Sequence, residues 1–200
     1  MPKRPEPPTP HIYTVEELRR LLERTDTLET LKSPLQAATF KTLLLVLYGT
    51  GLRISEALSL TISLTDVNLD DSLIIVRDSK FFKIRLVPTD PRLTEHLHSY
   101  LERRRRLPLP LGGDSAFFAT RTGHHLSYDR AKEVFSLLRN LAGIARTDGA
   151  RRAPRIHDLR HTAAVHRLEA WYRQDADVQR LLPRLSTYPG HVCIAETHGT

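Results

Sequence analysis

The sequence of 200 residues predicts an α+β fold that is mainly α and carries one small antiparallel β-sheet. Apolar residues recur at helical spacing in several separate stretches, which favours a largely helical chain. Two short β-prone runs, residues 73–76 and 84–87, are separated by a polar loop, as is typical of an antiparallel hairpin. A chain of this length can bury a substantial hydrophobic core, so one domain is expected.

The first residues are predicted to form a Pro-rich tail or linker, residues 1–12, ahead of a domain that spans residues 13–200. Five of the first ten residues are prolines, which disfavour both helix and strand. An ordinary disordered terminus is an equally good interpretation of this composition. Thr14 and Glu17 then have the spacing of a capping box, which predicts a first helix that ends near Arg24.

The next predicted helix runs from Leu35 to Tyr48 and is apolar on all sides, so we expect it to be buried. Gly49 is its predicted end, because Gly49 and Gly51 permit the left-handed or close-approach conformations found at helix ends. Residues 53–58 are expected to restart a short helix after this turn.

After the hairpin, the chain is predicted to be mostly helical. Amphipathic helices are expected at residues 93–106 and 128–142, with a third short strand at residues 117–119 between them. A further helix starts at His157 and is expected to turn its apolar side to the core. The residues predicted to form that buried side are Ala163, Ala164, Val165, Leu168 and Trp171. Residues 181–185 and a segment opening at Gly190 are predicted to form the last helices.

The charge balance points to a polyanionic partner. Thirty Lys and Arg residues against 23 Asp and Glu give a net charge of +7, and clustered cations bind nucleic acid by releasing its counterions. Two basic runs stand out: residues 103–106, and the group formed by Arg151, Arg152 and Arg155. We expect the second group to contact DNA, whereas the first run is equally well explained as a solvated helix end.

The cysteine count and the apolar segments indicate the cellular compartment in which the protein is expected. A single cysteine, Cys193, excludes an internal disulfide and a CxxC metal framework. The N-terminus lacks the apolar segment of a signal peptide, and no apolar run is long enough to span a bilayer. We therefore expect a cytoplasmic protein with no membrane partner and no cofactor.

The segment His157-Asp158-Leu159-Arg160-His161 places His157, Arg160 and His161 on one face of a helix. Two imidazole rings beside a guanidinium group suit a phosphoryl group, although structural histidines are the other interpretation. The spacing also resembles the H-E-x-x-H zinc helix of metallohydrolases, with Asp158 in place of Glu. No obvious third ligand follows and Arg160 would put a cation beside the ion, so we predict no metal site.

Residues 49–56 read G-T-G-L-R-I-S-E and contain Arg53 and Glu56, which alone are typical of a surface ion pair at a helix corner. Together with the H-x-L-R-H segment and Gly190-His191, however, these residues resemble the catalytic domain of the tyrosine recombinases, the phage-integrase family. The resemblance extends over residues 13–200. It implies a DNA breaking-rejoining fold, site-specific recombination or integration of double-stranded DNA, and other recombinase protomers as partners.

The same resemblance implies a metal-free site built from cations. The implied catalytic residues are Arg53, Lys80, His157, Arg160 and His191, with supporting roles for Glu56 and His161. The two arginines would clamp the phosphate, because preorganised positive charge stabilises the negative charge that develops during transfer. The histidines at 157 and 191 would be further donors or proton shuttles, and the hairpin lysine would protonate the leaving 5′-oxygen.

The chain departs from the family pattern at two places. Ser79 and Phe81 flank Lys80, where relatives commonly have a glycine beside the lysine. The nucleophilic tyrosine is expected nine residues after His191, and that position is Thr200, whose hydroxyl is far less acidic than a phenol.

From this departure we predict that the chain alone does not cleave DNA. It would then be a truncated or frame-shifted relative, or a partner would supply the tyrosine. The alternative function is a non-catalytic DNA-binding module or regulator derived from a recombinase.

Overall fold

The computed structural model describes residues 9–63, 66–78, 83–175 and 177–181. Within them the chain forms the helices α1 (Val15–Arg24), α2 (Gln36–Thr50), α3 (Ile54–Leu58), α4 (Pro91–Arg105), α5 (Tyr128–Leu141) and α6 (Asp158–Arg173), the short 3-10 helix η1 (Thr25–Leu28), and the strands β1 (Val67–Asn68), β2 (Leu73–Asp78) and β3 (Lys83–Pro88). The predicted α+β class, mainly helical with a small antiparallel sheet, is confirmed.

Helix α1 begins as its sequence predicts. The Thr14 hydroxyl accepts a hydrogen bond from the Glu17 backbone at 3.1 Å, and the Glu17 carboxylate accepts one from the Thr14 backbone at 2.9 Å. This reciprocal pair satisfies two backbone donors that the first helical turn leaves open. The helix ends at Arg24, also as predicted.

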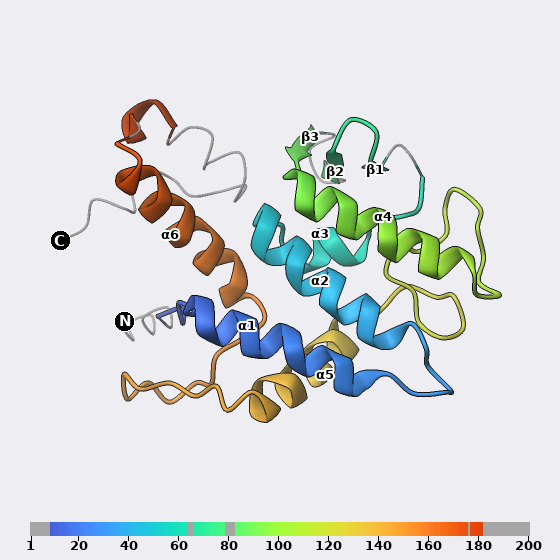
Figure 1. Cartoon of the computed structure of the whole chain (residues 1–200), viewed down its shortest axis with the longest axis horizontal. Helices are drawn as coiled ribbons and strands as arrows, with labels where there is room; N and C mark the ends of the chain where they lie inside the picture. Colours follow the sequence, from blue (N-terminus) through green and yellow to red (C-terminus); the bar gives the residue numbers. More distant parts are fainter. Residues whose placement is uncertain (1–8, 64–65, 79–82, 176, 182–200) are drawn as a thin grey trace, which may run out of the picture.

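Helix α2 lies at the centre of the molecule, with α1 and α5 on one side and α4 and the sheet on the other (Figure 1). Phe40, Leu43 and Leu47 are among its buried residues, which confirms the prediction of an internal helix. Although α2 is strongly apolar, none of the described helices is long and apolar enough to cross a bilayer.

Helix α2 ends at Thr50, one residue beyond Gly49, the predicted end. Gly49 is inside the helix, where a Cβ atom would approach Leu93 Cδ2 to 3.0 Å, so a glycine there permits close packing against α4. Gly51 takes the left-handed conformation, with φ of 66°, and its N–H donates to the Leu47 carbonyl at 3.0 Å. Gly51 is thus the residue that turns the chain toward Arg53.

The sheet has the order β1-β2-β3, and β2 pairs with β3 as the predicted hairpin. The third strand, however, is β1 and not residues 117–119, where Ala119 forms only an isolated bridge to His125 and the preceding Ala116 forms another to Thr61. Phe117 and Phe118 are fully buried, and the Tyr100 hydroxyl donates to the Phe117 carbonyl at 3.0 Å. Aromatic packing in the core, and not strand pairing, holds that segment.

Helix α6 corrects another prediction. The apolar residues expected on its buried side are only partly buried, namely Ala163, Ala164, Val165, Leu168 and Trp171. The fully buried residues are instead Asp158, Leu159, Arg160 and Thr162 in its first turns. The helix packs against α2, and its C-terminal end extends outward from the body of the molecule (Figure 1).

The basic run at the end of α4 is not a continuous surface patch. Arg103, Arg105 and Arg106 are exposed, whereas Arg104 is completely buried. Its Nη2 donates to the Pro110 carbonyl at 2.9 Å, while its Nε and Nη1 have no partner within the described residues. The helical period explains the difference, because one residue in such a run must face the core.

Candidate functional site

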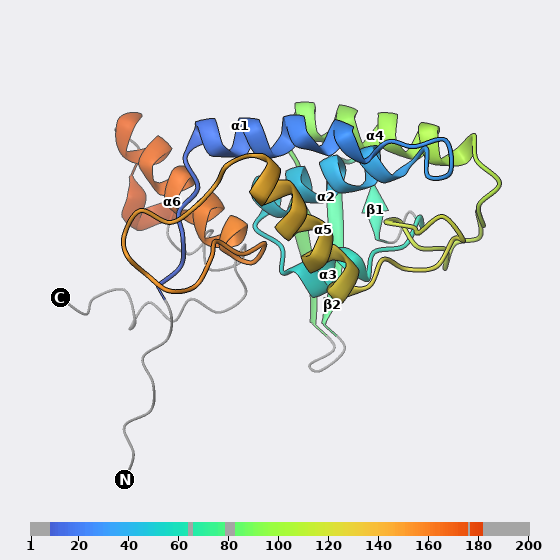
Figure 2. The same ribbon diagram turned by 90° about the horizontal axis from the view of Figure 1, so that it is seen from below.

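One carboxylate gathers three arginines from distant parts of the sequence. Glu56, in α3, lies 3.2 Å from Arg53 Nη1, 2.9 Å from Arg85 Nη2 and 4.0 Å from Arg160 Nη1. We call these four residues the Glu56 cluster. Its members come from the start of α3, from β3 and from α6, and Figure 2 shows α3 next to the hairpin strands.

Arg53 is held by the start of α3. It occupies the N-cap position, and its backbone N–H donates to Glu56 Oε2 at 2.7 Å while its Nη1 donates to Oε1 at 3.2 Å. The i,i+3 pair expected at a surface corner therefore exists. It is more than a surface pair, because the Glu56 side chain is only 17% exposed and is shared with two further arginines.

Arg160 is the buried arginine of the cluster. Its Nη1 donates to the Gly51 carbonyl at 2.6 Å, so the left-handed turn after α2 directly positions this guanidinium. Burial, together with the neighbouring cations Arg53 and Arg85, lowers the pKa of Arg160 to about 10 against the opposing effect of Glu56. Arg160 is still charged at neutral pH.

The guanidinium groups of Arg53 and Arg160 thus lie within 4.0 Å of one carboxylate. They are close enough for a single phosphate group to meet both, since an arginine donates along a planar fork of five N–H groups. Glu56 holds the three positive charges together without neutralising them, and the cluster carries a net charge of about +2.

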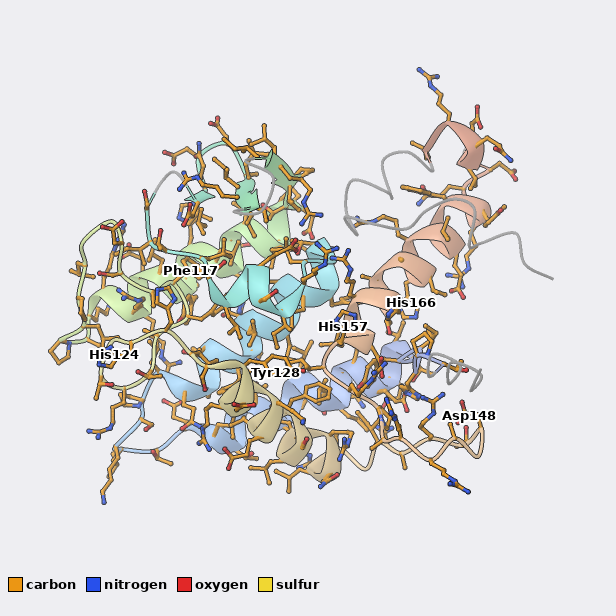
Figure 3. All side chains as sticks on the ribbon, turned by 180° about the vertical axis from the view of Figure 1, so that it is seen from behind. Phe117, His124, Tyr128, Asp148, His157 and His166 are labelled. Carbon is orange, nitrogen blue, oxygen red and sulfur yellow. The ribbon has the colours of Figure 1, made fainter. Side chains whose placement is uncertain are left out.

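His157 lies where α6 begins (Figure 3). His161 follows one turn later, and the two ring centroids are 5.4 Å apart with the ring planes at 76°. Partial burial lowers the pKa of both imidazoles, and the charges of Arg155 and Arg160 lower both further, against the opposing effect of Asp158. Both rings are therefore mainly neutral at pH 7. Each can donate one ring N–H to an anion and take up a proton when negative charge arrives.

A buried polar network supports the first turn of α6. The Asp158 carboxylate accepts hydrogen bonds from the Arg155 backbone at 2.9 Å and from the Arg155 guanidinium at 2.8 Å. Thr162 Oγ1 donates to the Asp158 carbonyl at 2.9 Å and accepts from the Tyr13 backbone at 3.0 Å. The Tyr13 hydroxyl donates to the Arg155 carbonyl at 3.0 Å, and burial raises the pKa of that phenol.

This network also bears on the zinc-helix interpretation. Asp158, which would replace the glutamate of that motif, is fully buried and engaged by Arg155. Within the described residues, no group of three or more His, Cys, Asp or Glu side chains is arranged to hold a metal ion. The geometry therefore gives the metallohydrolase alternative no support.

Two further contacts fix α6 to the end of α2. The Tyr48 hydroxyl and His166 Nδ1 hydrogen bond at 2.9 Å, and Arg167 Nη2 donates to the Gly49 carbonyl at 3.0 Å. Figure 3 shows His157 and His166 at different levels of the same helix. With the Arg160 bond to Gly51, α6 thus contributes two arginines that bind carbonyl groups of the 49–51 turn.

The described part of the predicted site comprises Arg53, Glu56, His157, Arg160 and His161. Lys80, His191 and Thr200 lie outside the described residues, so their predicted roles stay predictions.

Arg85 is the member of the cluster that sequence reasoning did not assign. In strand β3, Arg85 lies on the same face as the buried Val87, whereas its neighbours Ile84 and Leu86 are on the opposite, exposed face. An inward-facing charge on a strand implies a buried partner.

The basic segment before α6 has a mixed environment. Arg151 and Arg152 are exposed, whereas Arg155 is bound to Asp158 with a side chain 40% exposed. Arg146, earlier in the same segment, pairs with Asp148 through Nε at 2.8 Å, and Figure 3 shows Asp148 at the edge of the molecule. Two of the three predicted DNA-contacting arginines are thus open to a large ligand.

Comparison with known proteins identifies relatives along most of the chain. The sequence profile of the phage integrase family matches residues 12–183. The protein y4rB of Sinorhizobium fredii, by name an integrase/recombinase, is 34% identical over 200 residues, which cover 98% of this chain and 62% of that protein. Tyrosine recombinase XerA of Thermococcus kodakarensis is 31% identical over 163 residues, covering 80% of this chain and 49% of its own length. The chain therefore spans about half to three fifths of the length of these relatives.

Solved structures show the same fold. A crystal structure of XerA recombinase superposes with a TM-score of 0.70 at 24% identity, covering 98% of this chain and 62% of that one. The Tn1549 transposon integrase, in complex with circular intermediate DNA, superposes with a TM-score of 0.68 at 20% identity over 100% of this chain and 64% of its own.

Proposed function

The chain belongs to the phage integrase family, and from this premise we propose that it binds double-stranded DNA and holds one phosphodiester group in the Glu56 cluster for strand transfer in site-specific recombination. The observation that carries the proposal is the approach of Arg53 and Arg160 to one carboxylate. A net charge of about +2 suits a phosphodiester whose negative charge grows as an oxygen nucleophile attacks phosphorus.

In this proposal Arg53 and Arg160 form the phosphate clamp. His157 and His161, both neutral at pH 7, would donate to non-bridging oxygens or exchange a proton with them. No step requires a metal ion, because the guanidinium groups supply the positive charge.

Three further roles are proposed for residues that lie outside the described part of the chain. Lys80 would give its proton to the 5′-oxygen as the bond between phosphorus and that oxygen breaks. His191 would be an additional donor, and position 200, which carries a threonine, would correspond to the nucleophile of the family. The division into a tail of residues 1–12 and a domain of residues 13–200 is part of the same proposal, as is a cytoplasmic location, where the DNA substrate is found.

The DNA duplex would pass over the start of α6. Arg151 and Arg152 are exposed there, and Arg155 follows, so the clamp and the basic segment would contact neighbouring phosphates of one backbone. Recombination joins two duplexes, and we therefore propose other recombinase protomers as partners.

A binding and cleavage experiment tests the proposal. Arg160→Gln should weaken binding of orthovanadate, an oxyanion that can become five-coordinate like the transferred phosphorus, by at least about tenfold, because a charge-assisted interaction is lost. Arg173→Gln removes an exposed arginine from the far end of the same helix and is the matched control. Equal effects of the two substitutions would contradict the clamp.

The alternative function, a DNA-binding module without catalysis, differs in one observable. A nicked duplex that traps covalent intermediates should yield no denaturation-resistant protein–DNA adduct if the threonine at position 200 cannot act as nucleophile. An adduct would show that a side chain of this protein attacks phosphorus, and peptide mapping would identify it.

A further inference from the structure

We propose that Arg85 is a positioning residue for the phosphate clamp: by occupying Glu56 it prevents that carboxylate from capturing Arg160, whose donors then stay available to a phosphate. The inference deepens the proposed function and rests on the role assigned there to Arg160. It concerns the one arginine of the Glu56 cluster that the family resemblance did not assign.

The hydrogen-bonding capacity of Glu56 is the first step. Each carboxylate oxygen accepts about two hydrogen bonds. Oε2 already accepts from the Arg53 backbone at 2.7 Å and from Arg85 Nη2 at 2.9 Å, while Oε1 accepts from Arg53 Nη1 at 3.2 Å. Oε2 is therefore saturated by Arg53 and Arg85 together.

The position of Arg160 is the second step. Its Nη1 lies 4.0 Å from that same oxygen, which is near enough for attraction but too far for a hydrogen bond. Within the described residues the guanidinium makes one hydrogen bond, to the Gly51 carbonyl. A movement of about 1 Å would convert the distant pair into a charge-assisted hydrogen bond, if Oε2 had a vacant acceptor site.

The position and burial of the Arg85 side chain on β3 are the third step. It lies in β3 opposite Val76, and the next cross-strand pair on the same face, Ile74 and Val87, is completely buried. The Arg85 side chain is only 18% exposed. A side chain held on a paired and buried strand face has little freedom to leave Glu56, so it occupies Oε2 as a fixed part of the fold.

The consequence is that the three arginines have different roles: Arg53 and Arg85 occupy Glu56 Oε2, and Arg160 stays available to a phosphate. Without Arg85, an Arg160–Glu56 hydrogen bond would compete with phosphate binding, because a charge-assisted hydrogen bond between two groups that are already largely buried is stronger than in water. With Arg85 in place, Glu56 attracts Arg160 into the cluster, but Oε2, the oxygen nearest to Arg160 Nη1, has no vacant acceptor site. The arrangement preorganises Arg160 for the substrate.

A crystal structure of Arg85→Met tests the geometric claim without reference to activity. Methionine keeps the apolar length of the side chain and removes the donor, so the distance from Arg160 Nη1 to Glu56 Oε2 should shorten from 4.0 Å to about 2.9 Å. Arg85→Lys, which retains a charged donor, should leave it near 4.0 Å. A distance unchanged in Arg85→Met would overturn the inference.

Orthovanadate titration of the full chain, followed by calorimetry, tests the functional claim. Arg85→Met should weaken binding by about tenfold, and Arg85→Lys should recover most of that loss. Adding Glu56→Gln to Arg85→Met should restore binding in part, because a neutral amide no longer competes for Arg160. A merely structural role of Arg85 would instead make the two substitutions additive or worse.

Arg77→Met is the matched control. Arg77 lies on the partner strand of the same hairpin and pairs with another carboxylate, Asp66, at 2.9 Å. Its loss changes the net charge equally but leaves the Glu56 cluster intact, so orthovanadate binding should stay within about twofold of the unaltered chain. Thermal unfolding of each variant separates a loss of fold from a loss of site.

The outcomes separate this inference from the proposed function. If the unaltered chain does not bind orthovanadate, or if Arg160→Gln binds it equally well, the proposed function fails. The Arg160–Glu56 distance in the Arg85→Met crystal structure then still tests whether Arg85 keeps Arg160 away from Glu56. If the clamp binds orthovanadate but Arg85→Met matches Arg77→Met, the proposed function stands and the inference about Arg85 is wrong.

Discussion

At the scale of single residues, the histidines at the start of α6 couple protonation to folding. The pKa of His157 and that of His161 are both lowered by partial burial and by nearby arginines. The unfolded chain, in which imidazole has a pKa near 6.5, therefore binds protons at a higher pH than the folded chain does. Acidification below that value favours unfolding, and the effect levels off once the folded imidazoles are protonated too.

We predict that the double substitution His157→Gln and His161→Gln reduces the loss of stability on acidification. The free energy of unfolding should fall less between pH 7.5 and pH 5.5 in this variant than in the unaltered chain, as measured by urea denaturation. Burial also lowers the pKa of His96, so some acid sensitivity should persist. Identical pH dependence in the two proteins would contradict the stated cause of the shifts.

A second prediction at this scale concerns Asp158. Its carboxylate is fully buried and accepts two hydrogen bonds from Arg155, so Asp158→Asn should destabilise the fold by about 2 kcal/mol through the loss of a charged acceptor. Asp148 also pairs with an arginine, Arg146, but its own side chain is 51% exposed, so Asp148→Asn is the matched control and should have a smaller effect. Chemical denaturation of both variants provides the measurement, and equal effects would show that burial of Asp158 adds nothing.

At the scale of elements, the turn between α2 and α3 has a structural and a functional part. Gly51 has φ of 66°, and a Cβ atom there would meet nothing within 4 Å, so backbone strain is the main effect of substitution. Gly143 has φ of 62° and equally open surroundings in the segment after α5. The two glycines differ in that the Gly51 carbonyl accepts the Arg160 hydrogen bond.

We therefore predict that Gly51→Ala and Gly143→Ala each destabilise the fold by about 1 kcal/mol. Only Gly51→Ala should also weaken orthovanadate binding, because a shifted carbonyl displaces Arg160. Thermal unfolding and calorimetric titration of both variants measure the two effects. Unchanged binding in Gly51→Ala, at the expected loss of stability, would show that the turn does not position the arginine.

Local patterns predicted the elements well and their tertiary partners poorly. The capping box at Thr14 predicted the start of α1, because caps depend on residues a few positions apart. The two-residue strand β1 is too short to leave a periodic signal. The buried face of α6 was misjudged because the residues buried in its first turns include polar ones, such as Arg160 and Thr162, that find hydrogen-bond partners in Gly51 and Tyr13.

The candidate site likewise has a part that local sequence motifs predict and a part that depends on tertiary packing. The spacing of motifs predicted site roles for Arg53 and Arg160, since family motifs are local in sequence. The contact between Arg85 and Glu56 depends on how the hairpin packs against α3, and no pattern within either segment fixes that packing. The same reason explains Arg104, which belongs to a run of four arginines and nevertheless lies in the core.

At the scale of the whole molecule, the two basic runs lie at opposite ends. The segment with Arg151 and Arg152 adjoins the start of α6, whereas the end of α4, with Arg105 and Arg106, lies on the far side of the molecule (Figure 1). Only the first segment is beside the proposed clamp. A duplex that places a phosphate at Arg160 therefore has the first segment within reach and approaches the second only by bending or by binding elsewhere.

This arrangement leads to a prediction about salt dependence. Each phosphate neutralised by a cation contributes about −0.9 to the slope of log affinity against log salt concentration, so removal of Arg151 and Arg152 together should make the slope less steep by about 2. Substitution of Arg105 and Arg106 by alanine removes the same charge from the other end, where Arg105 already pairs with Glu102, and should leave the slope unchanged. Fluorescence anisotropy with a 30-base-pair duplex, measured from about 50 to 200 mM salt, determines both slopes.

Because net charge changes equally in the two variants, equal slopes would mean that the chain attracts DNA through its overall charge and that the duplex has no fixed path over α6. A smaller slope for the first variant alone would instead place the duplex beside the Glu56 cluster, where Arg53 and Arg160 could reach its backbone.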